Sequence, residues 1–330
     1  MSAKLRANIT AVGHYLPDYI LTNAELETMV DTNDEWIKSR TGISERRILK
    51  DPDKATSFMA AQAAKEILKN RGINGSEIDA IIIATVTPDY LFPATAALVQ
   101  REINATNAFG FDLSAACSGF LFALTSGANL IESGRHKKVL VIGSDKMSSI
   151  VDYTDRATCI IFGDGAAGVL LEPTTEDVGI IDYIQRTDGN EAELLCQKGG
   201  GSKYPASIET VQNRDHYLRQ EGRIVFKKAT ESMADVSIEI LKKNGLTNED
   251  VDWFVPHQAN NRIITATAGR MGVDINKVMI NIEKYGNTTA ATIPLCLYDW
   301  SNKVKKGDNI VLASFGGGFT WGAIYLKWGI

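Results

Sequence analysis

The stretch Phe109-Gly-Phe-Asp-Leu-Ser-Ala-Ala-Cys-Ser-Gly-Phe-Leu-Phe-Ala-Leu joins an apolar strand-like run, a turn of small residues and an apolar helical run. Strand–turn–helix units of this kind are typical of layered α/β folds. The turn places Cys117 at a helix N-terminus, where the helix dipole and unpaired backbone N–H groups favour a thiolate and can hold a developing negative oxygen. Cys117 is therefore a candidate nucleophile. The alternative is a cysteine buried only for packing, the role that we expect for Cys159, Cys196 and Cys296.

The chain contains an internal repeat. Residues 66–83 match residues 239–256 without a gap, an offset of 173, and each copy has a helix end, a glycine, a short acidic connection and a buried strand. A second match at the same offset aligns residues 138–143 with residues 311–316, and both strands end in a glycine. We therefore predict a duplicated α/β fold with an N-terminal half, residues 1–175, and a C-terminal half, residues 176–330.

The repeat locates possible partners of Cys117 in the second half. His257 follows a buried strand, which is where α/β folds place their chemistry, although a structural histidine is the alternative. Asn287 lies in a small-residue turn that the offset relates to the Cys117 turn, and its alternative role is a helix N-cap. The glycines at 316–318 would let the backbone approach a reacting centre and direct an N–H toward it.

Composition excludes several classes of protein. The 330 residues are 44% hydrophobic and 23% charged, as in ordinary globular proteins, and the net charge of −5 gives no general footprint for nucleic acid or anionic membrane. No apolar run approaches the ~20 residues of a membrane span, and the N-terminus lacks a signal-peptide core. We expect a cytoplasmic protein with free thiols, and the absence of a ligand cluster predicts no metal or other cofactor.

Seven motifs carry a family resemblance. They are Asp31-Thr-Asn-Asp-Glu-Trp-Ile, Arg40-Thr-Gly-Ile, Ala115-Ala-Cys-Ser-Gly-Phe, Phe162-Gly-Asp-Gly-Ala, His257-Gln-Ala-Asn, Gly286-Asn-Thr and Phe315-Gly-Gly-Gly-Phe-Thr-Trp-Gly. In these motifs and their order, from Ile9 to the C-terminus, the chain resembles the ketoacyl-acyl-carrier-protein synthase III enzymes of the thiolase superfamily. The resemblance implies a layered αβαβα thiolase-like fold and a homodimer. It also implies the first condensation of type II fatty acid synthesis, between an acyl-CoA primer and malonyl-acyl-carrier protein.

The same resemblance implies a role for each candidate residue. Cys117 would carry the acyl group, and the backbone N–H groups of Cys117 and Gly317 would form the oxyanion hole. His257 and Asn287 would donate hydrogen bonds to the enolate that forms when the malonyl unit loses CO₂. Elongating relatives carry a second histidine where this chain has Asn287, so the set is that of a priming enzyme.

Further contacts follow from the resemblance alone. Thr32, Trp36, Arg40, Arg156 and Asn260 would bind CoA, with Asn260 in the pantetheine channel. Lys227, Gln258, Arg262 and Arg270 would bind the acyl carrier protein, and Gly269 stands where some relatives carry an additional lysine. Met147, Phe162 and Leu194 would shape the acyl pocket, and Phe92 would close the pocket of the partner subunit. The excursion after residue 187 suggests a primer that is branched or longer than acetyl.

Two other functions remain open at this stage. A related condensing enzyme could use the same three residues to make a starter unit for quinolone or polyketide synthesis. A non-catalytic subunit of a heterodimeric synthase is the second alternative, although such subunits usually lose the cysteine that this chain has at position 117.

Overall fold

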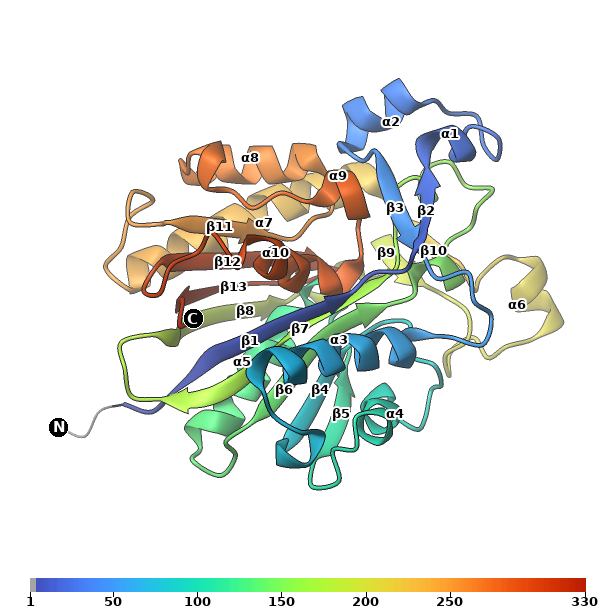
Figure 1. The fold of residues 1–330 in the computed structure, drawn as a ribbon. Coiled ribbons are helices and arrows are strands. Elements are labelled where there is room, and N and C mark those ends of the chain that lie inside the picture. Colours follow the sequence, from blue (N-terminus) through green and yellow to red (C-terminus); the bar gives the residue numbers. More distant parts are fainter. Residues whose placement is uncertain (1–3) are drawn as a thin grey trace.

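Two mixed β-sheets organise the computed structural model, which describes residues 4–330 (Figure 1). The first sheet has the order β1 (Arg6–Tyr15), β7 (Gly165–Thr174), β6 (Val139–Asp145), β4 (Ala80–Ala84), β5 (Phe109–Leu113). Strand β4 runs parallel to β5 and β6, whereas β7 is antiparallel to β6 and β1. The second sheet has the order β11 (Trp253–Pro256), β12 (Asn309–Gly316), β13 (Thr320–Lys327), β8 (Gly179–Thr187), with only β11 and β12 parallel.

Equivalent elements of the two halves begin 173 residues apart. This offset relates β1 to β8, β4 to β11, and the buried helix α5 (Gly119–Glu132) to α10 (Thr292–Trp300). A parallel bridge between Phe254 and Val278 lies beside β11 where the first sheet has β5. The predicted boundary at 175/176 falls in the connection between β7 and β8.

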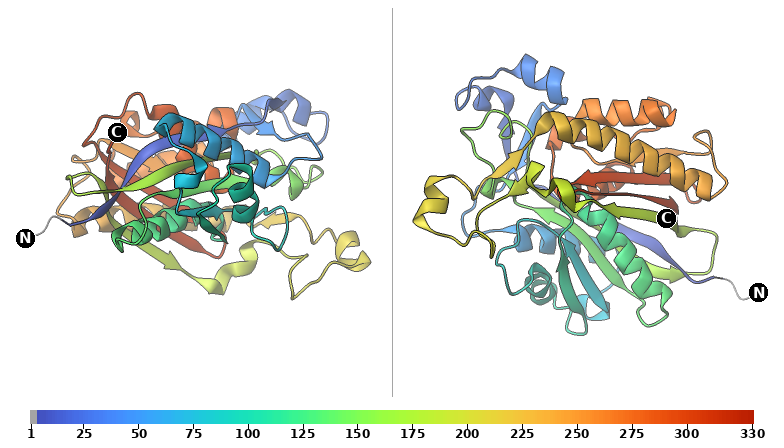
Figure 2. Two further views of the ribbon diagram at one scale, coloured as in Figure 1. Left: turned by 60° about the horizontal axis from the view of Figure 1, so that its bottom comes forward. Right: turned by 180° about the vertical axis from the view of Figure 1, so that it is seen from behind.

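The helices form three layers around the sheets, which gives the αβαβα arrangement. Helices α5 and α10 lie between the sheets, and their apolar residues join both sheets in one core. Helices α3 (Thr56–Arg71) and α4 (Thr95–Glu102) cover the outer face of the first sheet, and α7 (Gly222–Lys243) and α8 (Asn261–Met271) cover that of the second (Figures 1 and 2). Strand β4 is buried along its whole length, as expected of a strand covered on both faces.

Two excursions leave these layers. In the first, β2 (Tyr19–Thr22) pairs with β3 (Glu45–Ile48) around the short helices α1 (Asn23–Leu26) and α2 (Asp34–Thr41). In the second, β9 (Leu195–Gln197) pairs with β10 (Leu218–Gln220), and α6 (Ile208–Gln212) projects from the body of the molecule (Figures 1 and 2). The remaining helix, α9 (Ile282–Tyr285), precedes the turn that contains Asn287.

Candidate active site

The turn that carries Cys117 is held by the opposite half of the chain. Cys117 lies in a 3₁₀ turn, residues 116–118, between β5 and α5. The hydroxyl of Ser314 on β12 donates to the Cys117 carbonyl at 2.8 Å, and the hydroxyl of Thr320 on β13 donates to the Ala115 carbonyl at 2.9 Å. The hydroxyl of Ser118 donates in return to the Thr320 carbonyl at 3.0 Å. The candidate nucleophile is therefore positioned by the strands of the second sheet.

Burial, rather than the helix dipole, dominates the electrostatics of Cys117. The residue is 8% exposed, and burial together with the charge of Asp145 raises the pKa of its thiol to about 12, although a hydrogen bond from Asn287 lowers it in part. The sequence-based expectation of a thiolate favoured by the helix N-terminus is thus wrong for this pocket, because desolvation outweighs the dipole. At neutral pH Cys117 is therefore a thiol.

His257 follows β11 and is 2% exposed. Burial lowers the pKa of its imidazole to about 3, so the ring is neutral at physiological pH. Its Nδ1 lies 2.7 Å from the hydroxyl oxygen of Thr292, which in turn lies 3.1 Å from the carbonyl oxygen of Thr289. If the hydroxyl donates to the carbonyl, Nδ1 carries the hydrogen and Nε2 is a proton acceptor. If the hydroxyl donates to Nδ1, Nε2 carries the hydrogen.

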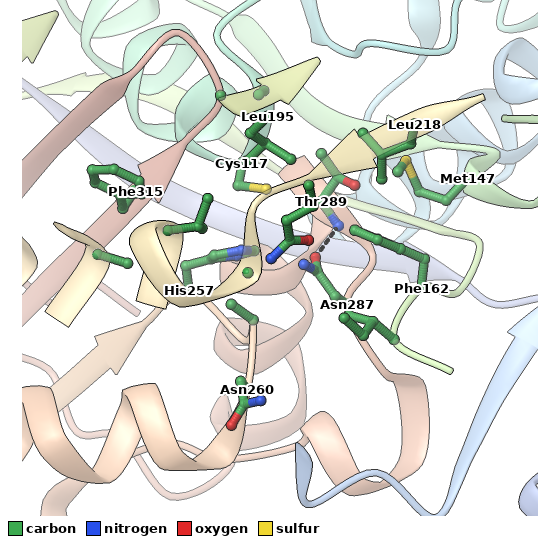
Figure 3. A pocket seen from close by; sticks show the side chains of 18 of the residues that line it. Cys117, Met147, Phe162, Leu195, Leu218, His257, Asn260, Asn287, Thr289 and Phe315 are labelled. Carbon is green, nitrogen blue, oxygen red and sulfur yellow. Dashed lines mark hydrogen bonds between the residues drawn. The ribbon is translucent and has the colours of Figure 1, made fainter. Parts of the chain in front are cut away.

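Asn287 lies in the turn between α9 and α10 and is 5% exposed. Its Oδ1 accepts a hydrogen bond of 2.8 Å from the backbone N–H of Thr289 (Figure 3). This contact occupies the amide oxygen, so the amide nitrogen is the group left to meet Cys117. Asn287 is not the N-cap of α10, which is Ala291, and its contact with Thr289 is a turn contact that leaves the amide nitrogen available to the site.

Cys117, His257, Asn287 and Gly317 line one cavity of about 300 Å³ (Figure 3). Among the residues within 4–330 that line this cavity, none carries a charged Lys, Arg, Asp or Glu side chain. Most of the wall is apolar and comes from both halves of the chain and from the β9–β10 excursion: Val86, Met147, Ile150, Ile161, Phe162, Leu195, Leu218, Val225, Phe226, Met233, Ile263 and Phe315. The enclosure fits an apolar acyl chain and a thioester arm.

Glycines bring the loop after β12 against the Cys117 turn. A Cβ atom on Gly316 would lie 2.7 Å from the Cys117 backbone nitrogen, closer than real Cβ atoms approach. A Cβ on Gly317 would lie 2.8 Å from the Leu195 carbonyl oxygen, so this glycine is enclosed on its other side by β9. The backbone of the glycine run thus packs directly against the backbone of the Cys117 turn, a close approach of the kind that an oxyanion hole requires.

Known proteins match this chain along its length. Two family models match, "3-Oxoacyl-[acyl-carrier-protein (ACP)] synthase III" over residues 111–189 and its C-terminal counterpart over residues 241–328. The β-ketoacyl-[acyl-carrier-protein] synthase III 2 of Bacteroides thetaiotaomicron is 57% identical over 99% of this chain and 97% of its own. The chain belongs to the 3-oxoacyl-[acyl-carrier-protein] synthase III family.

Solved structures agree with the family and the thiolase-like fold. The 3-oxoacyl-[acyl-carrier-protein] synthase III of Aquifex aeolicus is 44% identical, with a TM-score of 0.91 over 98% of this chain and 100% of its own. The priming β-ketosynthase of the R1128 polyketide pathway is 32% identical, with a TM-score of 0.90 over 98% of this chain and 96% of its own. The predicted fold class is confirmed.

The residues expected at the CoA nucleotide gather around α2, outside the cavity. The Arg156 guanidinium lies 5.1 Å from the centre of the Trp36 ring. The Asn260 side chain, which does line the cavity, donates to the Arg40 carbonyl at 3.0 Å. Thr32 Oγ1 is buried without a partner among residues 4–330. Their nucleotide contacts remain predictions.

Of the residues expected to meet the carrier protein, three are exposed and one is not. Lys227, Arg262 and Arg270 are at the surface of α7 and α8, where Arg270 pairs with Asp235 at 2.7 Å. Gln258 is fully buried, and its amide nitrogen donates to the carbonyls of residues 256 and 279 at 2.7 and 3.1 Å. Gln258 therefore holds the loop after β11, and the expectation of a surface contact there is wrong.

The acyl-pocket expectations hold only in part. Met147 and Phe162 line the cavity, whereas Leu194 does not and Leu195 takes its place. Leu194 ends a 3₁₀ helix, residues 189–194, whereas Leu195 begins β9, whose pairing with β10 places it at the cavity. Phe92 is 87% exposed on its own subunit. Its predicted contact would lie on a second copy.

Sequence reasoning also missed residues that organise the site. Thr292 is one, because its hydroxyl contacts His257. Cys196 is another: we expected it to serve only in packing, but it lines the cavity. Asp145 is a third: its Oδ1 accepts from the hydroxyls of Thr85 and Thr87 at 3.0 and 2.9 Å, and its Oδ2 accepts from the Ala290 backbone at 3.3 Å. Burial raises the pKa of the Asp145 carboxyl to about 6. The only feature of the sequence that could have drawn attention to Thr292 is the repeat offset, which relates it to the start of α5.

Proposed function

We propose that this protein is the acyltransferase that initiates type II fatty acid synthesis. It would transfer an acyl group from CoA to Cys117 and condense it with malonyl-acyl-carrier protein to give β-ketoacyl-acyl-carrier protein, CoA and CO₂. The observation that carries the proposal is the meeting of a thiol, an imidazole and a carboxamide in one apolar cavity, in a chain of the synthase III family. These three groups suffice for both half-reactions, so no metal or redox cofactor enters the proposed chemistry.

The first half-reaction needs a proton acceptor. Because the Cys117 thiol has a pKa of about 12, its attack on the primer thioester must be accompanied by loss of the proton. The neutral imidazole of His257, with Nδ1–H bonded to Thr292, offers Nε2 as the acceptor. Backbone N–H groups of Cys117 and Gly317 would hold the tetrahedral oxyanion. As its C–S bond breaks, CoA takes the proton from Nε2 and leaves as the thiol.

The second half-reaction needs hydrogen-bond donors at the same place. When the malonyl thioester loses CO₂, its carbonyl oxygen gains enolate charge, which Nε2–H of His257 and the Asn287 amide can stabilise. Removing one such donor typically costs about 10²–10³ in rate. Nε2–H requires the other tautomer of the ring, in which Nδ1 gives its proton to solvent and Nε2 takes one from solvent before the malonyl unit binds. The Thr292 hydroxyl, which lies within reach of both Nδ1 and the Thr289 carbonyl, then turns to donate to Nδ1.

Mass spectrometry of the intact protein tests the proposal. Acetyl-CoA and branched or longer acyl-CoA primers should each be offered, and we expect an acyl adduct that Cys117→Ala lacks. A protein that stays unlabelled across the primer panel would favour the non-catalytic subunit. The adduct should then disappear on addition of malonyl-acyl-carrier protein, with formation of the β-ketoacyl product.

A starter-unit enzyme for polyketide synthesis is the second candidate, favoured by the 32% identity to the R1128 priming ketosynthase. The two functions differ in the primer and in the carrier protein that accepts it. Turnover with the carrier protein of fatty acid synthesis supports the first candidate. A requirement for malonyl-CoA, or for a dedicated polyketide carrier, supports the second.

We further propose a homodimer in the cytoplasm. Within residues 4–330, strand β5 pairs only with β4 and leaves its other edge unpaired, and Phe109 and Phe111 on it are 46% and 37% exposed. In the neighbouring loop, Leu91 and Phe92 are 86% and 87% exposed. Apolar groups clustered beside an open strand edge are typical of a surface that a second chain covers. Among residues 4–330, no helix is long and apolar enough to cross a bilayer.

A further inference from the structure

The hydroxyl of Thr289 is a polar group that the structure leaves unused. Several buried side-chain polar atoms lack a hydrogen-bond partner within residues 4–330, and Thr289 Oγ1 is the one that belongs to a lining residue of the active-site cavity. Thr289 is only 2% exposed. An unpaired buried hydroxyl is unfavourable, so it is a group that gains from meeting a ligand.

The backbone contacts of Thr289 account for its position in the turn, but they do not involve its hydroxyl. Its N–H donates to Asn287 Oδ1 at 2.8 Å, and its carbonyl lies 3.1 Å from the Thr292 hydroxyl that contacts His257. The residue has a φ of 55°, a strained value for a β-branched side chain. Ala116, at the equivalent position of the Cys117 turn, has a φ of 47° without any hydroxyl. The turn itself therefore does not need the oxygen of Thr289.

The chemistry of the cavity shows what the hydroxyl could bind. The proposed second substrate carries a free carboxylate, yet the lining residues within 4–330 include no Lys or Arg, and His257 is neutral. This arrangement suits decarboxylation, because charge leaves the carboxylate as CO₂ forms. A cation at the carboxylate would stabilise the ground state more than the transition state. A neutral donor can instead orient the carboxylate without trapping its charge.

We propose that Thr289 Oγ1 donates a hydrogen bond to the carboxylate of the malonyl thioester and sets the direction in which CO₂ leaves; this rests on the proposed function. Thr289 and Asn287 both line the cavity and are joined by a hydrogen bond, so a malonyl unit held by Asn287 would lie beside Thr289, whose buried hydroxyl would turn toward the carboxylate (Figure 3). The bond between the carboxylate carbon and the methylene carbon breaks, and its electron pair forms the enolate. CO₂ departs neutral, and Thr289 keeps its hydrogen.

The remaining steps form the new C–C bond and release Cys117. The enolate carbon attacks the acyl carbonyl on Cys117 and forms the new C–C bond. The bond between that carbonyl carbon and the Cys117 sulfur then breaks, and the sulfur recovers a proton from solvent. Thr289 takes no part in acylation, because the primer carries no carboxylate. Its contribution is therefore confined to the malonyl half-reaction.

Two variants of the full-length protein separate the hydroxyl from the shape of the side chain. Thr289→Val keeps the β-branch and removes the hydroxyl, whereas Thr289→Ser keeps the hydroxyl. Acylation of Cys117 is followed by intact mass, and the decay of the acyl-enzyme is followed after mixing with malonyl-acyl-carrier protein. A hydrogen bond to a charged group contributes roughly 1.5–3 kcal/mol, so we expect Thr289→Val to slow condensation about 10- to 100-fold. Both variants should acylate within about twofold of wild type, and Thr289→Ser should condense within about threefold.

Each outcome either supports or contradicts a role of the Thr289 hydroxyl in condensation. Condensation at the wild-type rate in Thr289→Val would overturn the proposal, and equal losses of acylation and condensation would show a structural role instead. If Thr289→Val does not fold, Thr289→Ala supplies a second variant without the hydroxyl. Wild-type protein that acylates but never reacts with malonyl-acyl-carrier protein would refute the proposed function itself, before any variant is compared.

Discussion

At the scale of single residues, burial sets the protonation states of the two reacting groups. The Cys117 thiol has its pKa raised to about 12, and the His257 imidazole has its pKa lowered to about 3. Desolvation is the main cause in each case, and it favours the uncharged form of both. The resting pair is therefore a neutral thiol and a neutral base, not a thiolate–imidazolium pair.

A neutral Cys117 thiol beside a neutral His257 imidazole predicts an acylation rate that changes little with pH. Between pH 7.5 and 9 neither group of the wild-type protein changes its charge, and the nearby Asp145 carboxyl, with a pKa of about 6, stays ionised, so the rate of acyl-Cys117 formation should be nearly constant. In His257→Ala the base is missing, and the rate should instead follow the thiolate, rising about tenfold per pH unit. Rapid-quench mass spectrometry at a series of pH values measures both. A wild-type rate that rises about tenfold per pH unit across this range would contradict the neutral pair.

His257 also predicts how stability depends on pH. Its pKa is 6.5 as a free group and about 3 in the folded protein, so the unfolded chain takes up a proton first as the pH falls. The folded state therefore loses stability below about pH 6.5, by about 2 kcal/mol between pH 7 and pH 5. His257→Gln should lose about 2 kcal/mol less over the same interval. Urea unfolding of both proteins at the two pH values tests this, and the opposite contribution of Asp145 cancels in the comparison.

At the scale of elements, two equivalent turns contact each other and both line the cavity. The turns at residues 116–118 and 289–291 each precede a buried helix, α5 and α10, and each begins with a residue of positive φ. The first turn contains Cys117, and the second follows Asn287. The end of β12 fits against the first turn only because Gly316 has no side chain.

Gly316→Ala tests this fit. The added methyl would lie 2.7 Å from the Cys117 nitrogen and 2.9 Å from the Ser118 nitrogen, both of which are backbone atoms that cannot turn aside. We expect a loss of about 1–3 kcal/mol in stability and at least about a tenfold slower acylation. Gly269→Ala is the matched control, because a Cβ there meets nothing within 4 Å and position 269 is in an exposed part of α8. Unchanged acylation in Gly316→Ala would show that the turn does not depend on this contact.

At the scale of the whole molecule, neither half makes the site alone. The first half supplies Cys117, and the second supplies His257, Asn287, Gly317 and the hydroxyls that hold the Cys117 turn. The proposed dimer would add a third contribution, since Phe92 cannot close its own cavity while it is 87% exposed. Assembly and activity should therefore be linked.

Phe111→Lys tests that link. A charge on the free edge of β5 should oppose pairing with a second copy, so the mass in solution should fall from two chains to one. Acylation should slow as well, because the partner's Phe92 is lost from the pocket. Ile275→Lys is the control, since Ile275 is 45% exposed and lies far from β5 in the chain. Light scattering that shows one chain for the wild type would contradict the dimer.

The sequence predicted more of the fold than of the site's chemistry. The repeat offset and buried strand patterns anticipated the paired halves, and the motif order identified the family. The positions of Cys117, His257 and Asn287 in one cavity follow from that duplication. The sequence did not predict the burial of Gln258 or the inward position of Leu195, because loop packing and strand pairing decide which side chains face the cavity.

What the sequence determined by itself is the order of chemical groups and the repeat that brings them together, since both depend on residue identity and spacing along the chain. The tertiary structure alone decided how these groups are charged and oriented. The helix start around Cys117 indicates a thiolate, but enclosure by both halves removes the water that would stabilise it. In the same way, the free hydroxyl of Thr289 and the contact between Thr292 and His257 arise only when residues of distant turns are packed into one wall.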